Sequence, residues 1–418
     1  MITSLRIENF KAFNESVELS LDADIKSKKF FTNYKTYNEY NVLKTLGIYG
    51  KNNVGKTCII NAARTIKNVL LNKIVDIHTN MFLQNAIASL GVSFIKDLKG
   101  YSFDFKYDTN TREFVYEKYA TFDTNKREKE KTLILKDCIN NIYECDNSDF
   151  KHLLPNLSND NIVLYTAKTN SFENIEQLKN IYTEFASKIY ILNMFNIPIT
   201  QTLEEMKKKD ENAQEIAEFI KKADLEINNF EFNEDVVIEF EDINNKDSKP
   251  VPEEKIFHKP EMMELLKLVT YHKDRPVPFM LFDSTGTKKI AAVASYIIKN
   301  IKNGGTLFID ELDSGLHFKL SRAIIAMYNN LSNSNGQLIF TTHDINLMDC
   351  KKLLRKEQIW FADKDSKRTY LYSLNDFKTR DGVRSGVTDV NDLYKKGMIA
   401  NLPEPDLISW LLGVKNDK

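Results

Sequence analysis

Short apolar runs that end at polar residues are the clearest pattern in the sequence. Residues 43–49, 306–309 and 337–340 are short and rich in apolar and β-branched positions, which is typical of strands buried on both faces. The first and second runs are followed, over residues 58–71 and 318–331, by apolar positions three and four apart. Because strands alternate with amphipathic helices in this order, the pattern predicts an α/β fold with a parallel sheet.

Other spacings mark off the middle of the chain. Residues 101–142 alternate apolar and polar positions around turn residues, which predicts a subdomain of β-hairpins. Residues 170–225 carry apolar positions at helical spacing, and residues 236–241 predict one further strand before a polar segment. We therefore expect a mixed sheet with an inserted, mainly helical arm. The three predicted parts are residues 1–165, 166–260 and 261–418.

The composition narrows the class of protein. The 418 residues are 42% apolar and carry a net charge of -1, so any contact with nucleic acid depends on a local patch or a partner. Cys58, Cys138, Cys145 and Cys350 have neither the spacing of a metal site nor a CxxC pair. No apolar stretch is long enough to cross a bilayer. We expect a cytoplasmic protein that does not associate with membranes.

A phosphate-binding motif follows the first of the apolar runs. GKNNVGKT at residues 50–57 matches G-x-x-x-x-G-K-[ST], and it has the required strand before it and helix after it. In such a loop the glycines let backbone N–H groups surround a phosphate, the lysine neutralises phosphate oxygens, and the last hydroxyl binds Mg²⁺. The predicted nucleotide-binding residues are Gly50, Lys51, Asn52, Asn53, Val54, Gly55, Lys56 and Thr57.

Two adjacent carboxylates end the second apolar run. Asp310 and Glu311 lie at the C-terminal end of a predicted strand, where open α/β sheets hold their ligands. A bound metal and a polarised water would explain why two neighbouring acids stay ionised. The alternative is that they cap the helix that follows.

Two further motifs come from the same part of the chain. Residues 279–282 predict a strand, followed by a turn at Ser284 and an amphipathic helix. Residues 337–344 predict another buried strand, which ends at His343. Taken singly, the first motif is equally the start of a capped helix, and the second a histidine satisfied in the core.

Together these motifs resemble the ABC-type ATPase heads of the SMC, RecF and OLD group. The S-x-G-T-K-K form of residues 284–289, the D-x-G-L-H form of residues 313–317 and the tail at residues 358–377 are most similar to the AbiLi-like abortive-infection ATPases of bacterial phage defence, of the AAA family. The sequence departs from the family pattern in two places. Asp283 precedes Ser284 where transporters have leucine, and the Q-loop has no clear counterpart, with Gln84 as its candidate. The corresponding segments are a first strand at 5–13, Walker A at 50–57, a signature at 283–289, Walker B at 308–311, a D-loop at 312–317 and the switch histidine His343.

The resemblance implies hydrolysis of ATP to ADP and phosphate, with ATP and Mg²⁺ as cofactors. It assigns Lys56 to the phosphates, Thr57 and Asp310 to Mg²⁺, Glu311 to the general base, and His343 to the γ-phosphate. These are the predicted metal and catalytic residues.

The resemblance also implies a homodimer whose two heads enclose ATP. Ser284, Gly286 and Thr287 of one chain would complete the site of the other, because each chain has one Walker A motif and one signature. A higher oligomer and direct contact with nucleic acid are left open. The resembling systems act in anti-phage defence and control a separately encoded effector, an RloB-like TOPRIM nuclease.

Three alternatives share parts of this pattern. A GTPase would use the same loop, and residues 283–286 read D-x-x-G, but the chain lacks an N-K-x-D motif. A DNA-binding repair ATPase of the RecF or SMC type has every head motif. A fused nuclease would need a TOPRIM domain, for which Asp363 and Asp365 are the only D-x-D after His343; too few residues follow for such a domain, and we expect these two to be surface acids.

Overall fold

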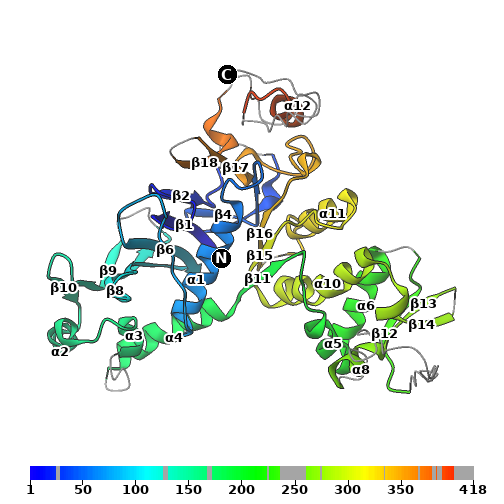
Figure 1. The fold of residues 1–418 in the computed structure, drawn as a ribbon, viewed down its shortest axis with the longest axis horizontal. Helices are drawn as coiled ribbons and strands as arrows, with labels where there is room; N and C mark the ends of the chain where they lie inside the picture. Colours follow the sequence, from blue (N-terminus) through cyan, green and yellow to red (C-terminus); the bar gives the residue numbers. More distant parts are fainter. Residues whose placement is uncertain are drawn as a thin grey trace, which may run out of the picture. The chain divides into compact units, whose positions relative to one another are not determined.

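The computed structural model describes residues 1–24, 29–125, 130–166, 172–223, 226–235, 260–273, 275–333, 335–365, 368–378, 383 and 388–399. The chain forms two compact units (Figure 1). The middle unit is Ile181–Phe340 together with Met1, and the terminal unit is Ile2–Asn180 together with Thr341–Lys418. The predicted division into residues 1–165, 166–260 and 261–418 stays a prediction.

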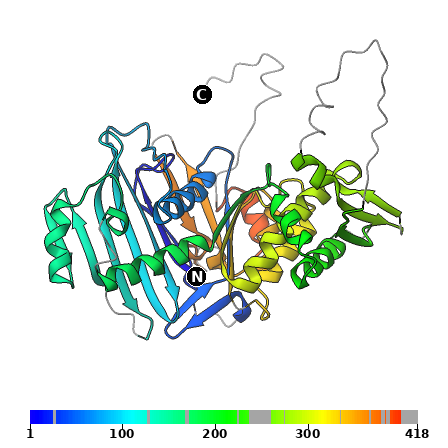
Figure 2. The same ribbon diagram turned by 90° about the horizontal axis from the view of Figure 1, so that it is seen from below.

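The hairpins of the terminal unit form an antiparallel sheet in the order β10-β9-β8-β7-β6-β1-β2 (Figure 2). Alternating aromatic residues fill its buried face: the rings of Phe103 and Tyr119 stack with centroids 4.8 Å apart. The predicted hairpin subdomain is therefore confirmed. Its strands are β1 (Ile2–Glu8), β2 (Val17–Ser20), β6 (Ile87–Lys96), β7 (Lys99–Asp108), β8 (Glu113–Asp123), β9 (Lys131–Asp137) and β10 (Ile142–Cys145).

The phosphate-binding loop of the terminal unit follows a fully buried strand. All five residues of β5 (Thr45–Tyr49) are buried, and α1 (Lys56–Leu70) begins within the motif. Strand β5 pairs in parallel with β17 (Ile359–Lys364), which pairs antiparallel with β18 (Thr369–Ser373). The predicted strand, loop and helix are all present.

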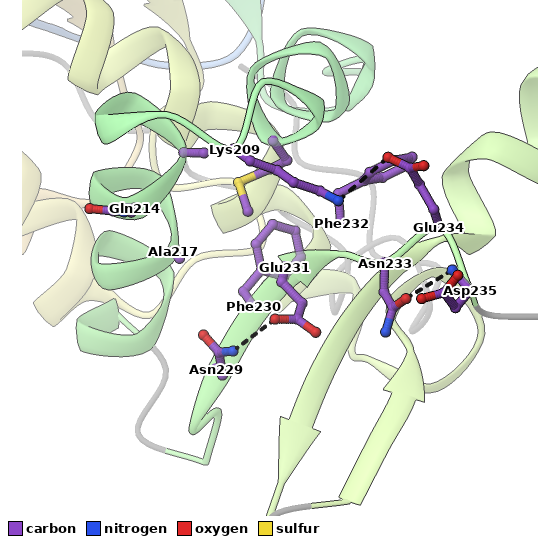
Figure 3. A pocket seen from close by; sticks show the side chains of 12 residues that line it. Lys209, Gln214, Ala217, Asn229, Phe230, Glu231, Phe232, Asn233, Glu234 and Asp235 are labelled. Atoms are coloured by element: carbon purple, nitrogen blue, oxygen red, sulfur yellow. Dashed lines mark hydrogen bonds and ion pairs between the residues drawn. The ribbon is translucent and has the colours of Figure 1, made fainter.

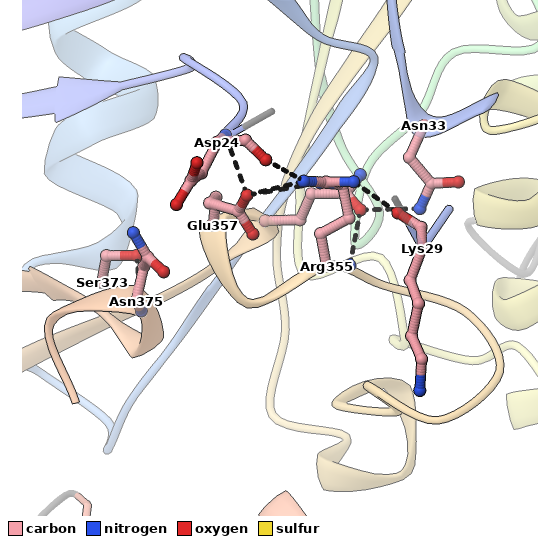
Figure 4. Close-up of polar contacts among 8 residues, drawn as sticks. Asp24, Lys29, Asn33, Arg355, Glu357, Ser373 and Asn375 are labelled. Carbon is pink, nitrogen blue, oxygen red and sulfur yellow. Dashed lines mark hydrogen bonds and ion pairs between the residues drawn. The ribbon is translucent and has the colours of Figure 1, made fainter. Parts of the chain in front are cut away.

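A buried arginine joins distant segments of this unit (Figure 4). Arg355 is 3% exposed, and its guanidinium pairs with Glu357 at 3.0 Å and donates to the carbonyls of Asp24, at 2.5 Å, and Lys29. The same Glu357 carboxylate accepts from the backbone N–H of Asp24 at 2.9 Å. The N-terminal and C-terminal segments are thereby fastened together beside β5.

Three parallel strands form the sheet of the middle unit. Strand β15 (Gly305–Asp310) pairs with β11 (Ile189–Asn193) on one side and β16 (Gly336–Thr341) on the other. The helix expected throughout residues 170–225 is wrong at β11: α4 (Glu173–Ser187) ends just before it. The Ile-Tyr-Ile-Leu run of β11 is rich in β-branched and aromatic residues, which favour strands, and its backbone pairs with that of β15.

Helices α5 (Thr200–Lys207), α6 (Glu211–Ala223) and α10 (Thr285–Asn303) share an apolar core with a small sheet. That sheet has the order β12-β13-β14, with β12 (Asn229–Phe232), β13 (Leu268–His272) and β14 (Arg275–Pro278) antiparallel. The strand expected at residues 279–282 is wrong, because this run is the short helix α9 (Phe279–Phe282). Its Phe279 is fully buried against Phe230 of β12.

The α/β class is confirmed by these elements. The strand expected at residues 236–241 lies outside the described residues. Within the described part of the chain, no helix is both long enough and apolar enough to cross a membrane. The remaining elements are η1 (Phe31–Asn33), β3 (Tyr34–Tyr37), β4 (Tyr40–Leu43), α2 (Ser148–Leu153), η2 (Leu154–Asn156), α3 (Val163–Thr166), α8 (Pro260–Leu266), α11 (Phe318–Tyr328), η4 (Ile345–Leu347), η5 (Lys356–Gln358), η6 (Leu374–Asp376) and α12 (Val390–Lys395).

Candidate functional site

The backbone of the phosphate-binding loop requires its glycines. Gly50 has a φ of 149°, and a Cβ there would lie 2.2 Å from the carbonyl oxygen of Ala362. Gly55, with a φ of 100°, occupies the N-cap of α1, where no side chain caps the helix. Asn53 is also left-handed, with a φ of 62°. The sharp turn leads directly into the first turn of α1, and helix N-termini favour anions.

Lys56 lies inside this loop. Its side chain is buried, and its ammonium donates to the carbonyl oxygens of Gly50 at 2.8 Å and Lys51 at 2.6 Å. Thr57, one residue later, is exposed on the first turn of α1. The loop thus combines a positive charge, a helix N-terminus and a hydroxyl on the first helical turn, which suits a polyphosphate with a divalent cation.

His343 lies beside the loop. A pocket of about 330 Å³ in the terminal unit is lined by His343 and Thr342 as well as by residues of the loop. The N–H of Thr342 donates to the carbonyl of Ile48 at 3.1 Å, so the segment after β16 is fixed to the phosphate-loop strand. The reading of His343 as a satisfied core histidine is wrong, since its side chain is exposed. The lining residues are Tyr49, Gly50, Lys51, Asn52, Thr342, His343, Ile345, Tyr394 and Lys395.

The acidic pair lies at the end of β15 in the middle unit. Asp310 is 2% exposed, and its Oδ2 accepts from the amide of Asn193 at 3.3 Å. Glu311 is partly exposed and has a φ of 57°, a left-handed conformation that costs energy for a glutamate and is common at functional sites. The next helix, α11, is capped by His317, whose ring accepts from the N–H of Lys319 at 3.3 Å. The helix-capping interpretation of Asp310 and Glu311 is therefore wrong.

Asn193 is a site residue that sequence reasoning missed. It ends β11 in register with Asp310, so parallel pairing brings an amide to a carboxylate. The strand-end rule that found Asp310 would have found Asn193, had residues 189–193 been recognised as a strand.

A metal at this site would need ligands beyond the protein. Among the described residues, no group of three or more His, Cys, Asp and Glu side chains could hold a metal ion. Mg²⁺ is usually held by one or two protein oxygens, with phosphates and waters completing its shell. Thr57 in the terminal unit and Asp310 in the middle unit each carry an oxygen donor of this kind.

The signature-like segment caps a long helix. Ser284 is the N-cap of α10, and its Oγ accepts from the N–H of Thr287 at 3.1 Å. Asp283, the residue that departs from the transporter pattern, is buried; Thr270 donates to it at 2.5 Å and the ring of His272 lies 3.2 Å away. The aspartate therefore fastens the start of α10 to β13, a role that leucine could not fill.

The same segment is joined to the D-loop-like turn. A Cβ on Gly286 would lie 3.2 Å from the carbonyl oxygen of Gly315. The ammonium of Lys289 donates to the carbonyl of Ser314 at 3.0 Å and lies 5.5 Å from the ring centroid of Phe195. The signature and D-loop segments, separated in sequence, are thus packed together within the middle unit.

Two lesser candidates have different outcomes. Gln84 is exposed in the segment between α1 and β6, and its assignment to a Q-loop stays a prediction. Asp365 is exposed as expected, but Asp363 is buried on β17. Its description as a surface acid is wrong, because β17 runs beside β5 in the interior.

A larger cavity, of about 550 Å³, lies in the middle unit away from these motifs (Figure 3). Four of its polar side chains pair with one another: Lys209 pairs with Glu234 at 3.4 Å, and Asn229 donates to Glu231 at 3.3 Å. We assign it no ligand. It is lined by Met206, Lys209, Ala213, Gln214, Ala217, Asn229, Phe230, Glu231, Phe232, Asn233, Glu234 and Asp235.

Known proteins similar to the chain fall into two groups. The model of a family described as "AAA domain, putative AbiEii toxin, Type IV TA system" matches residues 46–349. No curated protein matches.

Among solved structures, the SMC head domain from Thermotoga maritima is 11% identical, with a TM-score of 0.43 over 89% of this chain and 98% of its own. The SmcHead bound to the C-winged helix domain of ScpA is 12% identical, with a TM-score of 0.47 over 91% and 99%. An Smc head with an extended coiled coil, bound to the C-terminal domain of ScpA derived from Pyrococcus furiosus, is 12% identical, with a TM-score of 0.42 over 91% and 97%.

Proposed function

Since the chain belongs to this family of AAA domains, whose model spans 304 of its 418 residues, we propose that it binds ATP with Mg²⁺ and hydrolyses it to ADP and phosphate. The observation that carries the proposal is the phosphate-binding loop. Lys56 lies buried within a glycine-bounded turn at a helix N-terminus, and the pocket beside it includes His343.

The resemblance of the motifs to ATPase heads gives each side chain its proposed role. Lys56 neutralises phosphate oxygens, and Thr57 and Asp310 supply oxygens to Mg²⁺, which when bound offsets the charge of the phosphates. Glu311 orients the attacking water and accepts its proton, and His343 contacts the γ-phosphate. The left-handed backbone of Glu311, directly after a buried acid, supports this assignment, because residues with a strained backbone cluster at active sites, where the surrounding structure holds them in place. Positioning and charge, rather than covalent chemistry, lower the barrier.

We propose that two copies of the chain form the complete site. Each chain has one phosphate loop and one signature-like segment, so a two-fold dimer would give two sites. Ser284, Gly286 and Thr287 would close on the γ-phosphate of the partner chain. The N-terminus of α10 supports this, since the 19-residue helix has no acidic residue in its first turn and favours an anion there.

We further propose a role as sensor or regulator in anti-phage defence, acting on a separately encoded effector such as a TOPRIM nuclease. The family's description, which names an AbiEii toxin and a type IV toxin–antitoxin system, supports this role. Phage plating on cells that carry the chain with its neighbouring genes tests it. Loss of protection in Lys56→Ala cells is expected; protection by that variant would contradict an ATP-dependent role. ATP-dependent DNA binding by the purified dimer, without protection, would favour a repair ATPase instead.

Glu311→Gln tests the proposed chemistry. The amide keeps the size of the side chain but cannot accept the proton, so single-turnover hydrolysis should slow by about 10² to 10⁴, while ATP binding is retained. Glu218→Gln, an exposed change on α6, serves as the matched control and should hydrolyse at the wild-type rate. Near-normal turnover by Glu311→Gln would refute the assignment of the general base.

A further inference from the structure

A short helix near the C-terminus contributes to the pocket beside the phosphate loop. Lys395 and Tyr394 of α12 line this pocket of about 330 Å³ together with Lys51 and His343. None of the sequence motifs includes α12, which lies more than 330 residues after the loop. The position of α12 in the pocket wall is therefore seen only in the folded structure and could not be predicted from the motifs.

Helix α12 is held against the phosphate-loop strands by its own packing. The ring of Tyr394 is buried and stacks on Phe361 of β17, with centroids 5.9 Å apart and an interplanar angle of 19°. Phe361 pairs in register with Tyr49, the residue just before the loop. At the other end of the helix, Asp389 caps it and pairs with Lys351 at 3.1 Å. Lys395 is thus carried on a fixed element, although its own side chain is exposed.

The charges that line the pocket are of one sign. Two lysines and a histidine line it. In the described part of the chain, no carboxylate lines it. Within the part of the chain that the structure describes, the side chains of Lys51 and Lys395 form no hydrogen bond or ion pair. Convergent cations without acidic partners raise the local concentration of anions and are suited to bind one.

We propose that Lys395 is an additional phosphate-binding residue, which contacts the terminal phosphate of the bound nucleoside triphosphate from within the same chain. The inference rests on the proposed function, because it takes ATP to be the ligand of the phosphate loop. Lys56 lies inside the loop, whereas Lys395 and His343 line the pocket beside Gly50, Lys51 and Asn52 at the start of the loop. Lys395 should therefore distinguish a triphosphate from a diphosphate and make the position of α12 depend on the nucleotide.

Calorimetric titration with Mg²⁺ and either ADP or the non-hydrolysable analogue adenylyl-imidodiphosphate tests this contact. Loss of one exposed charge-assisted contact should weaken binding of the analogue to Lys395→Ala by about tenfold, while ADP binding stays unchanged. Lys395→Arg should keep most of the affinity, because it keeps the charge. The matched control is Lys396→Ala, which removes the neighbouring exposed lysine outside the pocket and should bind both ligands as the wild type does.

The outcomes separate this inference from the proposed function. If the wild-type protein binds both nucleotides and Lys395→Ala does too with unchanged affinity, Lys395 is not a phosphate ligand and the proposed function stands. Equal weakening of ADP and analogue would also overturn the contact with the terminal phosphate. If the wild-type protein binds neither nucleotide, the proposed function itself fails, and the inference fails with it.

Discussion

Replacing a fully buried glutamate of the hairpin sheet should change how the stability of the protein depends on pH. Glu117 of β8 is 0% exposed; its Oε2 accepts from the hydroxyl of Tyr119 at 2.7 Å and from the N–H of Val163 at 2.9 Å. In the described part of the chain, its Oε1 has no hydrogen-bond partner. Lys136 lies opposite on β9, but its ammonium donates to the carbonyl of Leu157 at 3.0 Å. Burial therefore raises the pKa of Glu117 from 4.5 to about 7.

The sign of the effect follows from proton binding. Because the folded pKa exceeds the unfolded pKa, the folded protein holds an extra proton between about pH 4.5 and pH 7. The stability linked to that proton is fully present below the unfolded pKa, and it is lost as the pH rises through the folded pKa. The shift corresponds to about 3 kcal/mol at roughly 1.4 kcal/mol per pKa unit. Of this, about 2.5 kcal/mol should disappear between roughly pH 5 and pH 8.

Urea unfolding followed by circular dichroism measures this difference. Glu117→Gln cannot titrate, so its free energy of unfolding relative to the wild type should rise by about 2.5 kcal/mol from roughly pH 5 to pH 8. Comparing two proteins at each pH cancels the other titrating groups. Glu144→Gln, an exposed change on β10, is the matched control and should follow the wild type at every pH. A constant difference between Glu117→Gln and the wild type would refute the reasoning.

Two further substitutions test packing and positioning. Arg355→Ala leaves the buried carboxylate of Glu357 without its cation, so that among the described residues only the N–H of Asp24 contacts it, and should lower the free energy of unfolding by about 3 to 5 kcal/mol. Adding Glu357→Gln should recover part of the loss, and an unchanged free energy of unfolding in Arg355→Ala would contradict the account. Asp283→Ala removes the acceptor of Thr270 beside Ser284 and should slow ATP hydrolysis by roughly 10- to 100-fold with little change in ATP affinity. A large loss of affinity in a binding assay would show that Asp283 does not act by positioning the signature.

The phosphate loop could be predicted because its residues combine a local sequence pattern with the chemistry of phosphate binding. The phosphate loop is specified by two glycines, a lysine and a hydroxyl within eight residues, and the structure has the strand, loop and helix as predicted. Membership of an abortive-infection-like AAA family is likewise confirmed by the family match. The assigned chemical roles stay predictions.

The two errors in secondary structure have a common physical cause. The runs at residues 189–193 and 279–282 are four or five residues long, and at that length an apolar run suits a strand or a helix equally well. Pairing with β15 makes the first a strand, and the second forms the short helix α9, in which Phe279 packs against Phe230. Lys395 had no local signal, because only the stacking of α12 on β17 brings it to the phosphate loop.

Complementation between two inactive variants tests the central claim most directly. Lys56→Ala removes the phosphate-binding lysine, and Ser284→Arg blocks the signature-like segment. Each variant alone should lack hydrolysis, since both of its composite sites are damaged. Ser332→Arg, an exposed change in a loop, is the control for the added charge and should hydrolyse ATP normally.

Steady-state hydrolysis is then measured for an equal mixture of the Lys56→Ala and Ser284→Arg proteins. Half of the dimers should be mixed, and each mixed dimer has one intact site, so activity should return to about a quarter of the wild-type level. If mixed dimers are shown to form and the mixture stays as inactive as either parent, the two chains do not share an ATP site.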